Sequence, residues 1–338
     1  MLAAPASEAE VRACVQDACA ICEIPAPTGE EGRRAAWVAE RLRETGLDVR
    51  VDAEGSVVAG AGDVVVAAHL DTVFAGLEAI AVRREGDVLH APGIGDNSLG
   101  VAALLFLARR RPDGLVLAAT VGEEGLGNLR GARRVVADLR PRELIALEGG
   151  GAGRLVIAGI GSARFAVRAT APGGHSWGDR GSPSALHVLI EVLHRHVADP
   201  GTESVNVGSL HGGAGINVLA PSAEATLEFR DSDEDRLAAA ARRLAAEPGV
   251  EVAELGRRPA GRIEPEHPLV LAALRAAASA GLARPRLDSS STDANAALGA
   301  GIPAVTVGLC ESRDAHTPEE RVDVSMLGPA LGALADLV

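Results

Sequence analysis

Acidic and histidine side chains follow several short apolar segments of this sequence, where the strands of a parallel sheet would end. His69 and Asp71 come directly after the apolar run 64–68, and the adjacent pair Glu123 and Glu124 follows another such run. Open α/β sheets form their sites at the carboxyl ends of their strands. A neutral imidazole binds zinc well, and a carboxylate two residues away can accept its second N–H and fix its tautomer.

Three further residues extend this pattern. Asp96 stands just before an expected helix, Glu148 follows the apolar run 144–147, and His316 lies beyond the run 304–309. Each has an ordinary structural alternative when taken alone, such as a helix cap for Asp96. Together, two imidazoles and three carboxylates suit two divalent ions about 3.5–4 Å apart that share one carboxylate, with a further carboxylate to carry a proton.

The elements that must position these residues alternate between helix and strand in the first half of the chain, as in doubly wound α/β domains. We expect helices at 33–42 and 99–109, the first of them capped by Thr28-Gly29-Glu30-Glu31, and strands at 47–51, 56–59, 64–68, 115–120 and 144–147. Near the end of the chain, a helix at 268–280 and a buried strand at 304–309 return to the same pattern.

The pattern changes after the glycine-rich stretch 149–153. Strands are expected at 162–169, 204–209, 223–230 and 250–255, and helices at 184–196 and 234–246. This order of elements is typical of a small α+β, ferredoxin-like domain. We therefore expect an α/β domain with a mixed sheet and helices on both faces over residues 1–158 and 262–338, with a second domain inserted over 159–261.

Composition excludes several classes of function. The 33 basic residues, all of them Arg, are outnumbered by 46 acidic residues, which gives a net charge of −13. An acidic chain without a basic patch repels nucleic acids and anionic membranes, so neither is an expected partner. The sequence has no Lys or Tyr, which excludes Schiff-base lysine and tyrosine acid–base chemistry.

The sequence indicates a cytoplasmic protein with reduced thiols. It opens without a basic segment and apolar core of the secretory kind, and its longest apolar runs, such as 101–108, are too short to span a bilayer. Four cysteines do not form a disulfide framework in a chain of this length. Cys19 and Cys22 form a C-x-x-C without a second pair, so buried structural thiols are expected.

Taken in order, the motifs resemble those of the M20 metallopeptidases and amidohydrolases, and the resemblance covers essentially the whole chain. The segments that carry it are Ala68-His69-Leu70-Asp71-Thr72-Val73, Gly95-Asp96-Asn97, Gly122-Glu123-Glu124-Gly125, Glu148, Gly173-Gly174-His175-Ser176, Ile216-Asn217-Val218 and Ala315-His316-Thr317. The resemblance implies a zinc-peptidase-like catalytic domain and an inserted lid domain through which the chain forms a homodimer.

The resemblance also implies a ligand set. Asp96 would bridge two divalent ions, with His69 and Glu148 completing one and Glu124 and His316 completing the other. Zinc is the expected metal, although this ligand set also suits cobalt or manganese. The peptide bond that follows Asp96 is expected to be cis.

Catalysis would rest on the neighbouring residues. Glu123 matches the family's general base, which takes a proton from the attacking water and delivers it to the departing amine. Asp71 would orient His69.

Three residues of the inserted domain are candidates for substrate binding. His175 matches a histidine that reaches the active site of the partner subunit to contact the oxyanion, although it could also be an ordinary loop residue beside Trp177. Asn217 and Arg230 lie where related enzymes hold the backbone or carboxylate of the substrate. Arg230 could equally pair with Asp231 or Asp233 at the surface.

The motifs differ on the substrate. Glu148 resembles the deacylase branch of the family, whereas the surroundings of Glu123 and His175 resemble relatives of peptidase T. We expect metal-dependent hydrolysis of an amide bond in small peptides, by a dipeptidase, tripeptidase or aminopeptidase. The alternative is a deacylase of N-acyl amino acids, such as acetyl or succinyl amino acids.

Two other functions fit parts of the sequence. Residues 174–178 satisfy the G-x-S-x-G pattern of serine hydrolases, with Ser176 as the nucleophile and Asp293 and His316 following in α/β-hydrolase order. This alternative leaves the acidic residues unexplained and lacks an expected helix directly after the serine. A metal- or amino-acid-binding protein that has lost its chemistry is the non-enzymatic alternative.

Overall fold

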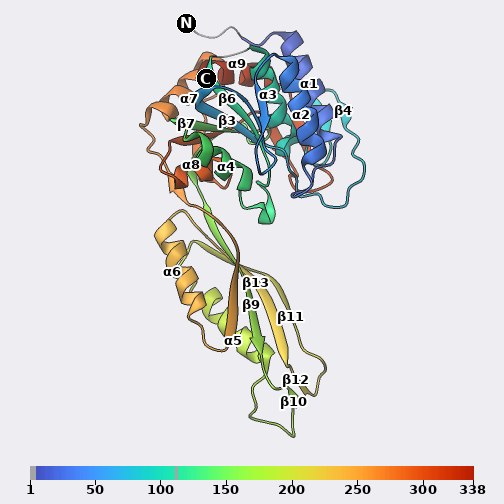
Figure 1. Ribbon diagram of the computed structural model, residues 1–338, viewed down its shortest axis with the longest axis vertical. Helices are drawn as coiled ribbons and strands as arrows, with labels where there is room; N and C mark the ends of the chain where they lie inside the picture. Colours follow the sequence, from blue (N-terminus) through green and yellow to red (C-terminus); the bar gives the residue numbers. More distant parts are fainter. Residues whose placement is uncertain (1–4, 111–112) are drawn as a thin grey trace. The chain divides into compact units, whose positions relative to one another are not determined.

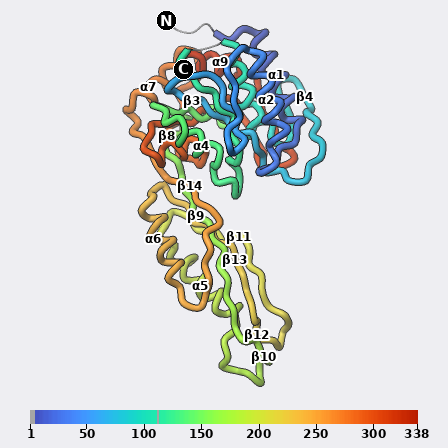
Figure 2. The backbone as a smooth tube through the Cα atoms, viewed as in Figure 1, coloured from blue at the N-terminus to red at the C-terminus, as the bar shows by residue number. Residues whose placement is uncertain are grey.

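The computed structural model describes residues 5–110 and 113–338. The described chain divides into two compact units. The first unit consists of the residues up to Gly159 together with Arg262–Val338, and the second unit is Ile160–Gly261. Figure 2 shows the second unit as one continuous stretch of chain that leaves the first unit and later returns to it.

Four parallel strands form the centre of the first unit's sheet (Figure 1). They lie in the order β6 (Gly114–Thr120), β3 (Gly62–His69), β7 (Glu143–Glu148) and β17 (Ala304–Gly308). Every residue from Val64 to Ala68 is buried, although successive side chains point to opposite faces. Both faces of the sheet are therefore covered, as is usual for parallel strands in α/β proteins.

Antiparallel strands at the sides of these four make the sheet mixed. β1 (Val49–Val51) pairs with β2 (Val57–Gly60), which pairs with β6. On the other side β8 (Arg154–Gly159) runs antiparallel to β17, β16 (Arg286–Ser290) is parallel to β8, and the path ends at β15 (Gly261–Arg262).

Helices of the first unit pack on this sheet and on one another. They are α1 (Glu8–Cys22), α2 (Gly32–Glu44), α3 (Leu99–Arg110), α4 (Arg130–Leu139), α7 (Pro268–Ser279), α8 (Ala294–Gly299) and α9 (Leu327–Leu337). Every residue of α3 from Leu99 to Ala108 is buried, because the helix lies between the sheet and α1. Among the described residues, no helix is both long and apolar enough to cross a membrane.

The four cysteines are free thiols, as predicted. Cys14 and Cys22 lie on the buried face of α1, and burial raises the pKa of Cys14 above its ordinary range and that of Cys22 to about 12. Thiols with such raised pKa values remain protonated at neutral pH, which makes them poor nucleophiles and poor metal ligands.

The predicted cap of α2 is wrong. The helix begins at Gly32, and Glu31 occupies the cap position without a side-chain hydrogen bond to the helix. Thr28 instead donates its hydroxyl to Asp71 Oδ2 at 2.9 Å. Because the Asp71 carboxylate is fully buried, it needs donors from neighbouring segments, and the hydroxyl of Thr28 serves that purpose.

A small antiparallel sheet in the first unit joins two distant parts of the chain. Its order is β18 (Glu311–Arg313), β19 (Arg321–Asp323), β5 (Val88–His90) and β4 (Arg83–Glu85). The pairing of β19 with β5 brings the segment around His316 close to the loop that carries Asp96.

The second unit has the ferredoxin-like order of elements. These are β9 (Gly161–Thr170), α5 (Ala185–Ala198), β11 (Ser204–Gly212), β13 (Ser222–Asp231), α6 (Glu234–Ala245) and β14 (Val250–Arg258), with a short ribbon of β10 (Gly174–His175) and β12 (Val218–Leu219). The four main strands form an antiparallel sheet in the order β11-β13-β9-β14. Its core includes Phe165 and Phe229, which meet edge to face. The predicted fold class is confirmed.

Candidate metal centre

The acidic and histidine residues named above meet at one edge of the first unit's sheet. His69 and Glu148 end β3 and β7, and the two glutamates follow β6. Asp96 lies in the segment η1 (Ile94–Ser98), just before α3, with non-helical backbone angles. Because β6, β3, β7 and β17 are parallel neighbours, their carboxyl ends share this edge. The residues brought together are His69, Asp96, Glu123, Glu124, Glu148 and His316.

Asp96 lies between the two imidazoles. Its Oδ1 is 3.0 Å from His69 Nε2, and its Oδ2 is 3.0 Å from His316 Nε2. Glu148 Oε2 lies 3.7 Å from His69 Nε2, and Glu124 Oε1 lies 3.2 Å from His316 Nε2. The Asp96 carboxylate therefore presents one oxygen to each of two groups of side chains. One group contains His69 and Glu148, and the other contains His316 and Glu124. The peptide bond after Asp96 is cis.

Burial and close contacts change the pKa values of these groups. Burial raises the pKa of Glu148 to about 7, because ionisation inside the protein costs free energy. Burial lowers the pKa of His69, but hydrogen bonds to Asp71, Asp96 and Glu148 outweigh this effect and raise it well above its ordinary value. Hydrogen bonds to Asp96 and Glu124 raise the pKa of His316 to about 10. The edge thus concentrates negative charge and favours bound cations.

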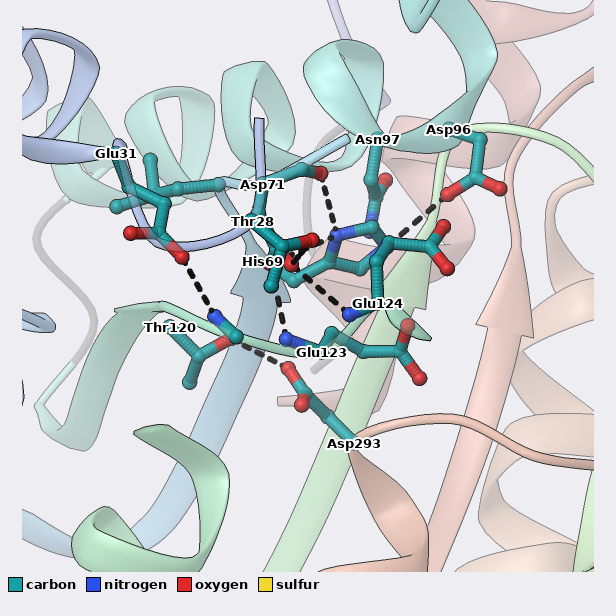
Figure 3. Close-up of polar contacts among 12 residues, drawn as sticks. Thr28, Glu31, His69, Asp71, Asp96, Asn97, Thr120, Glu123, Glu124 and Asp293 are labelled. Carbon is teal, nitrogen blue, oxygen red and sulfur yellow. Dashed lines mark hydrogen bonds and ion pairs between the residues drawn. The ribbon is translucent and has the colours of Figure 1, made fainter. Parts of the chain in front are cut away.

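Asp71 contacts both His69 and the two glutamates. His69 Nδ1 lies 3.0 Å from the backbone oxygen of Asp71 and 3.6 Å from its Oδ1, so the closer of the two contacts to the ring is with the backbone. The Asp71 carboxylate accepts hydrogen bonds from the backbone amides of Glu123 and Glu124, each at 2.9 Å (Figure 3). Asp71 therefore also holds the backbone of the residue that matches the general base.

Two buried residues that are not among the predicted ligands, Glu320 and Asn97, hold the Asp96 loop. The fully buried Glu320 carboxylate accepts from the backbone amides of Gly93, Gly95 and Asp96 at 2.6–2.9 Å. Asn97 donates to Leu147 O at 2.7 Å and accepts from Gly149 N at 2.9 Å. No spacing in the sequence indicates that Glu320 meets a loop more than 220 positions away.

The second unit carries the three candidate substrate-binding residues, His175, Asn217 and Arg230. Trp177 N and Gly178 N both donate to His175 Nδ1 at 3.2 Å, which leaves the ring proton on Nε2 as a donor. Arg230 forms two hydrogen bonds with Glu228, at 2.8 and 3.1 Å. The backbone oxygen of Asn217 accepts from Ser176 N at 2.9 Å.

A family model covers most of the chain, including the elements that carry this centre. Residues 65–338 match the model described as peptidase family M20/M25/M40. The chain belongs to this family. It is thus an M20-family metallohydrolase that acts on amide bonds, which confirms the predicted family and the predicted class of enzyme.

Curated relatives of this M20-family chain include proteins with deacylase-type names. A Pyrococcus abyssi protein with the provisional name LysW-lysine/LysW-ornithine hydrolase is 30% identical over 90% of this chain and 87% of its own length. A Mycobacterium tuberculosis protein with the provisional name succinyl-diaminopimelate desuccinylase is 28% identical over 93% of this chain and 95% of its own length.

Solved structures of M20-like fold extend the comparison. A tripeptidase from Staphylococcus aureus superposes with a TM-score of 0.83 at 20% identity, covering 97% of each chain. The aminopeptidase PepT from Bacillus cereus superposes with a TM-score of 0.80 at 20% identity, covering 97% of this chain and 98% of its own. At this identity the likeness establishes a shared fold.

The side chains of this M20 chain fit a pair of divalent cations. Two groups of three donors share Asp96, and within each group the ligand atoms lie within 4.8 Å of one another. Imidazole nitrogen and carboxylate oxygen are donors suited to zinc, cobalt and manganese. A third group joins His69 and Glu124 to Glu123, which places the matched general base beside the two others.

The serine-hydrolase alternative does not fit this arrangement. A nucleophile elbow needs a helix directly after the serine, but α5 begins only at Ala185, nine residues beyond Ser176. His316 contacts Asp96 and Glu124, and Asp293 accepts a hydrogen bond from the Thr120 hydroxyl. These residues therefore belong to the carboxylate-rich edge of the M20 sheet.

The raised pKa of His316 predicts a pH dependence of stability once metal is removed with a chelator. The folded pKa of about 10 lies above the ordinary value of 6.5, so the ion pairs stabilise the fold fully below pH 6.5 and progressively less as pH rises toward 10. The side chain is 54% exposed, and solvent screening limits the expected loss to about 1 kcal/mol. Urea unfolding of the chelated protein at several pH values measures this change in the free energy of unfolding.

His316→Gln is the control for this experiment. The variant lacks the titrating imidazole, so its unfolding free energy should change less between pH 6.5 and 10 than that of the chelated parent protein. Equal pH dependence in the two proteins would show that His316 is not the group responsible.

Proposed function

We propose that this chain is a two-metal peptidase that hydrolyses an amide bond in small peptides. The observation that carries the proposal is the position of Asp96, with one oxygen 3.0 Å from each of two imidazoles, and with Glu123 beside the same group. His69 and Glu148 would hold one ion, and Glu124 and His316 the other. Such a pair of ions, with zinc expected, would polarise the substrate carbonyl and activate water for attack.

Glu123 would act as the general base. The residue is 5% exposed, and its side chain lies beside His69 and Glu124. A carboxylate oxygen of Glu123 would accept the proton of the attacking water and then donate it to the departing amine nitrogen. Asp71 supports this role because it holds the Glu123 amide at 2.9 Å and so restricts the backbone that carries the base.

Residues of the second unit would bind the substrate in a homodimer. The Nε2–H of His175 is fixed as a donor by the two hydrogen bonds at Nδ1, which suits contact with the negative oxygen that develops during attack. Asn217 would hold the substrate backbone. Arg230 could bind a substrate carboxylate through its fork of donors, although it would have to share them with Glu228.

A deacylase of N-acyl amino acids is the second candidate. It is favoured by the curated relatives, whose provisional names describe removal of an amino acid from LysW or of a succinyl group from an amino acid derivative. The peptidase is favoured by the segments around Glu123 and His175, which resemble peptidase T relatives. Both reactions use the same metal centre and the same base.

Amine release from a panel of substrates separates the two candidates. The panel contains dipeptides, tripeptides and N-acetyl and N-succinyl amino acids, each assayed with zinc and again after chelation. Chelator-sensitive cleavage of peptides alone is the expected result and would show which end of the peptide is trimmed. Cleavage confined to acyl amino acids would establish the deacylase, and no metal-dependent release from any substrate would contradict both.

Replacement of His175 tests the proposed homodimer. His175→Ala should lower kcat by about 10²-fold, because it removes a donor to the developing oxyanion. If the histidine acts in the partner's active site, mixing this variant with Glu123→Gln should restore up to about a quarter of the parental activity through exchange into heterodimers. Steady-state assays before and after subunit exchange measure this, and a mixture with no more activity than its components would exclude action between subunits.

A further inference from the structure

Three consecutive backbone amides, those of Gly122, Glu123 and Glu124, are each held by a carboxylate oxygen from elsewhere in the first unit. Asp71 Oδ1 accepts from Glu123 N and Asp71 Oδ2 from Glu124 N, each at 2.9 Å. The third oxygen belongs to Glu31, whose Oε1 accepts from Gly122 N at 3.1 Å. The turn that carries the proposed base is thus restrained along its backbone by two buried side chains.

Glu31 connects this turn to two helices. Its side chain is buried, and the same Oε1 accepts from Gly29 N at 3.0 Å and from Arg130 Nη2 at 2.6 Å. Glu31 precedes the first residue of α2, and Arg130 is the first residue of α4, the helix that follows the turn. Movement of Gly122 would therefore disturb the start of both helices.

Arg130 also packs directly against Gly122. The glycine has φ +66°, and a Cβ added there would collide with the guanidinium. This position therefore favours glycine, because other residues rarely adopt this backbone conformation, and an added Cβ would also force the Arg130 side chain to move. The ion pair of Glu31 with Arg130 and the close packing on Gly122 together fix the peptide that enters Glu123.

We propose that Glu31 is a positioning residue for the general base Glu123, an inference that rests on the proposed function. Glu31 acts through the backbone, because its oxygen fixes the peptide that immediately precedes the base. A general base must lie within hydrogen-bonding reach of the proton it takes, and a displacement of about 1 Å can cost up to 10²-fold in rate. Asp71 holds the next two amides, so loss of Glu31 should displace the base more than the metal ligand Glu124.

The test compares Glu31→Ala with Glu31→Gln. Alanine removes the acceptor and leaves the Gly122 amide without its partner, so kcat should fall at least about tenfold. Both KM and the metal content should stay within about twofold, because Asp71 still holds Glu124. Glutamine keeps an oxygen where Oε1 lies and should restore most of kcat. Steady-state kinetics, metal analysis and thermal unfolding measure these quantities.

Glu247→Ala is the matched control. Glu247 is a largely buried carboxylate of the second unit that pairs with Arg195 at 2.6 Å, much as Glu31 pairs with Arg130. Its loss should lower Tm and leave kcat unchanged. A folded Glu31→Ala protein with a lowered Tm and parental kcat would overturn the proposal, as would loss of bound metal in proportion to activity.

A second variant covers failure of Glu31→Ala to fold. Gly122→Ala disturbs the same peptide from the opposite side, since its Cβ would meet Arg130, and it should also lower kcat with metal retained. Parental kcat in this variant would overturn the proposal. Substantial turnover by Glu123→Gln would instead contradict the proposed function, because no base would then remain for Glu31 to position.

Discussion

Glu123→Gln should abolish turnover and leave the metal content unchanged. Glutamine has nearly the same shape as glutamate, but its amide cannot take a proton from water at neutral pH. General-base catalysis contributes about 10²–10⁴-fold, and we expect kcat to fall by at least about 10³-fold because no second base is proposed. Glu123 lies outside the two groups that share Asp96, so both should keep their ligands. Steady-state kinetics with elemental analysis measures the two effects.

The adjacent Glu124→Gln variant provides the contrast. Glu124 lies 3.2 Å from His316 Nε2 and belongs to a group that shares Asp96, so its replacement should lower metal content as well as activity. The Glu123→Gln and Glu124→Gln variants, which change neighbouring residues in the same way, should thus differ in metal content. Residual activity above about a tenth of the parental value in Glu123→Gln would remove this residue as the base.

Asp96→Ala should abolish activity through loss of both metal ions. One Asp96 oxygen faces each imidazole at 3.0 Å, so removal of the carboxylate takes a ligand from both groups at once. Each site would be left with one imidazole and one carboxylate, fewer protein ligands than catalytic zinc sites generally have. We expect a loss of at least about 10³-fold in kcat/KM, since the chemistry depends on the metal pair. Metal analysis after dialysis measures the loss of the ions, and steady-state kinetics measures the loss of kcat/KM.

Glu148→Ala is the matched comparison for this prediction. Glu148 belongs to only one of the two groups that share Asp96, the one that contains His69. Its replacement should therefore weaken the binding of one ion and leave the binding of the other unchanged. An Asp96→Ala protein that still binds one ion as tightly as Glu148→Ala would show that Asp96 serves a single site.

Local sequence patterns were sufficient to predict the elements that carry the centre. The continuous apolar run 64–68 predicted β3, because a strand covered on both faces needs such a sequence. Residues 99–109 predicted α3 because they have helical spacing and end in arginines, which suit the carboxyl end of a helix. The positions of His69 at the end of β3 and of Glu148 at the end of β7 followed from the same apolar runs. Such patterns depend on near neighbours, which a single sequence shows directly.

The cap of α2 illustrates where this approach failed. Thr28 stands where a capping residue is expected, but its hydroxyl bonds Asp71, 43 positions away. A threonine hydroxyl satisfies a helix amide or a buried carboxylate equally well. The choice depends on which group is nearby and lacks a hydrogen-bond partner, and the sequence around Thr28 does not contain that information.

The sequence by itself determined the family, the two-part organisation and the residue types of the centre, because motif order and local periodicity are properties of the chain. The tertiary structure alone decided which buried carboxylates support that centre. Glu31 and Glu320 hold backbone amides 91 and more than 220 positions away, respectively. The sequence does not distinguish either glutamate from an exposed glutamate. Burial and the approach of distant amides give them their roles, and both arise only when the chain folds.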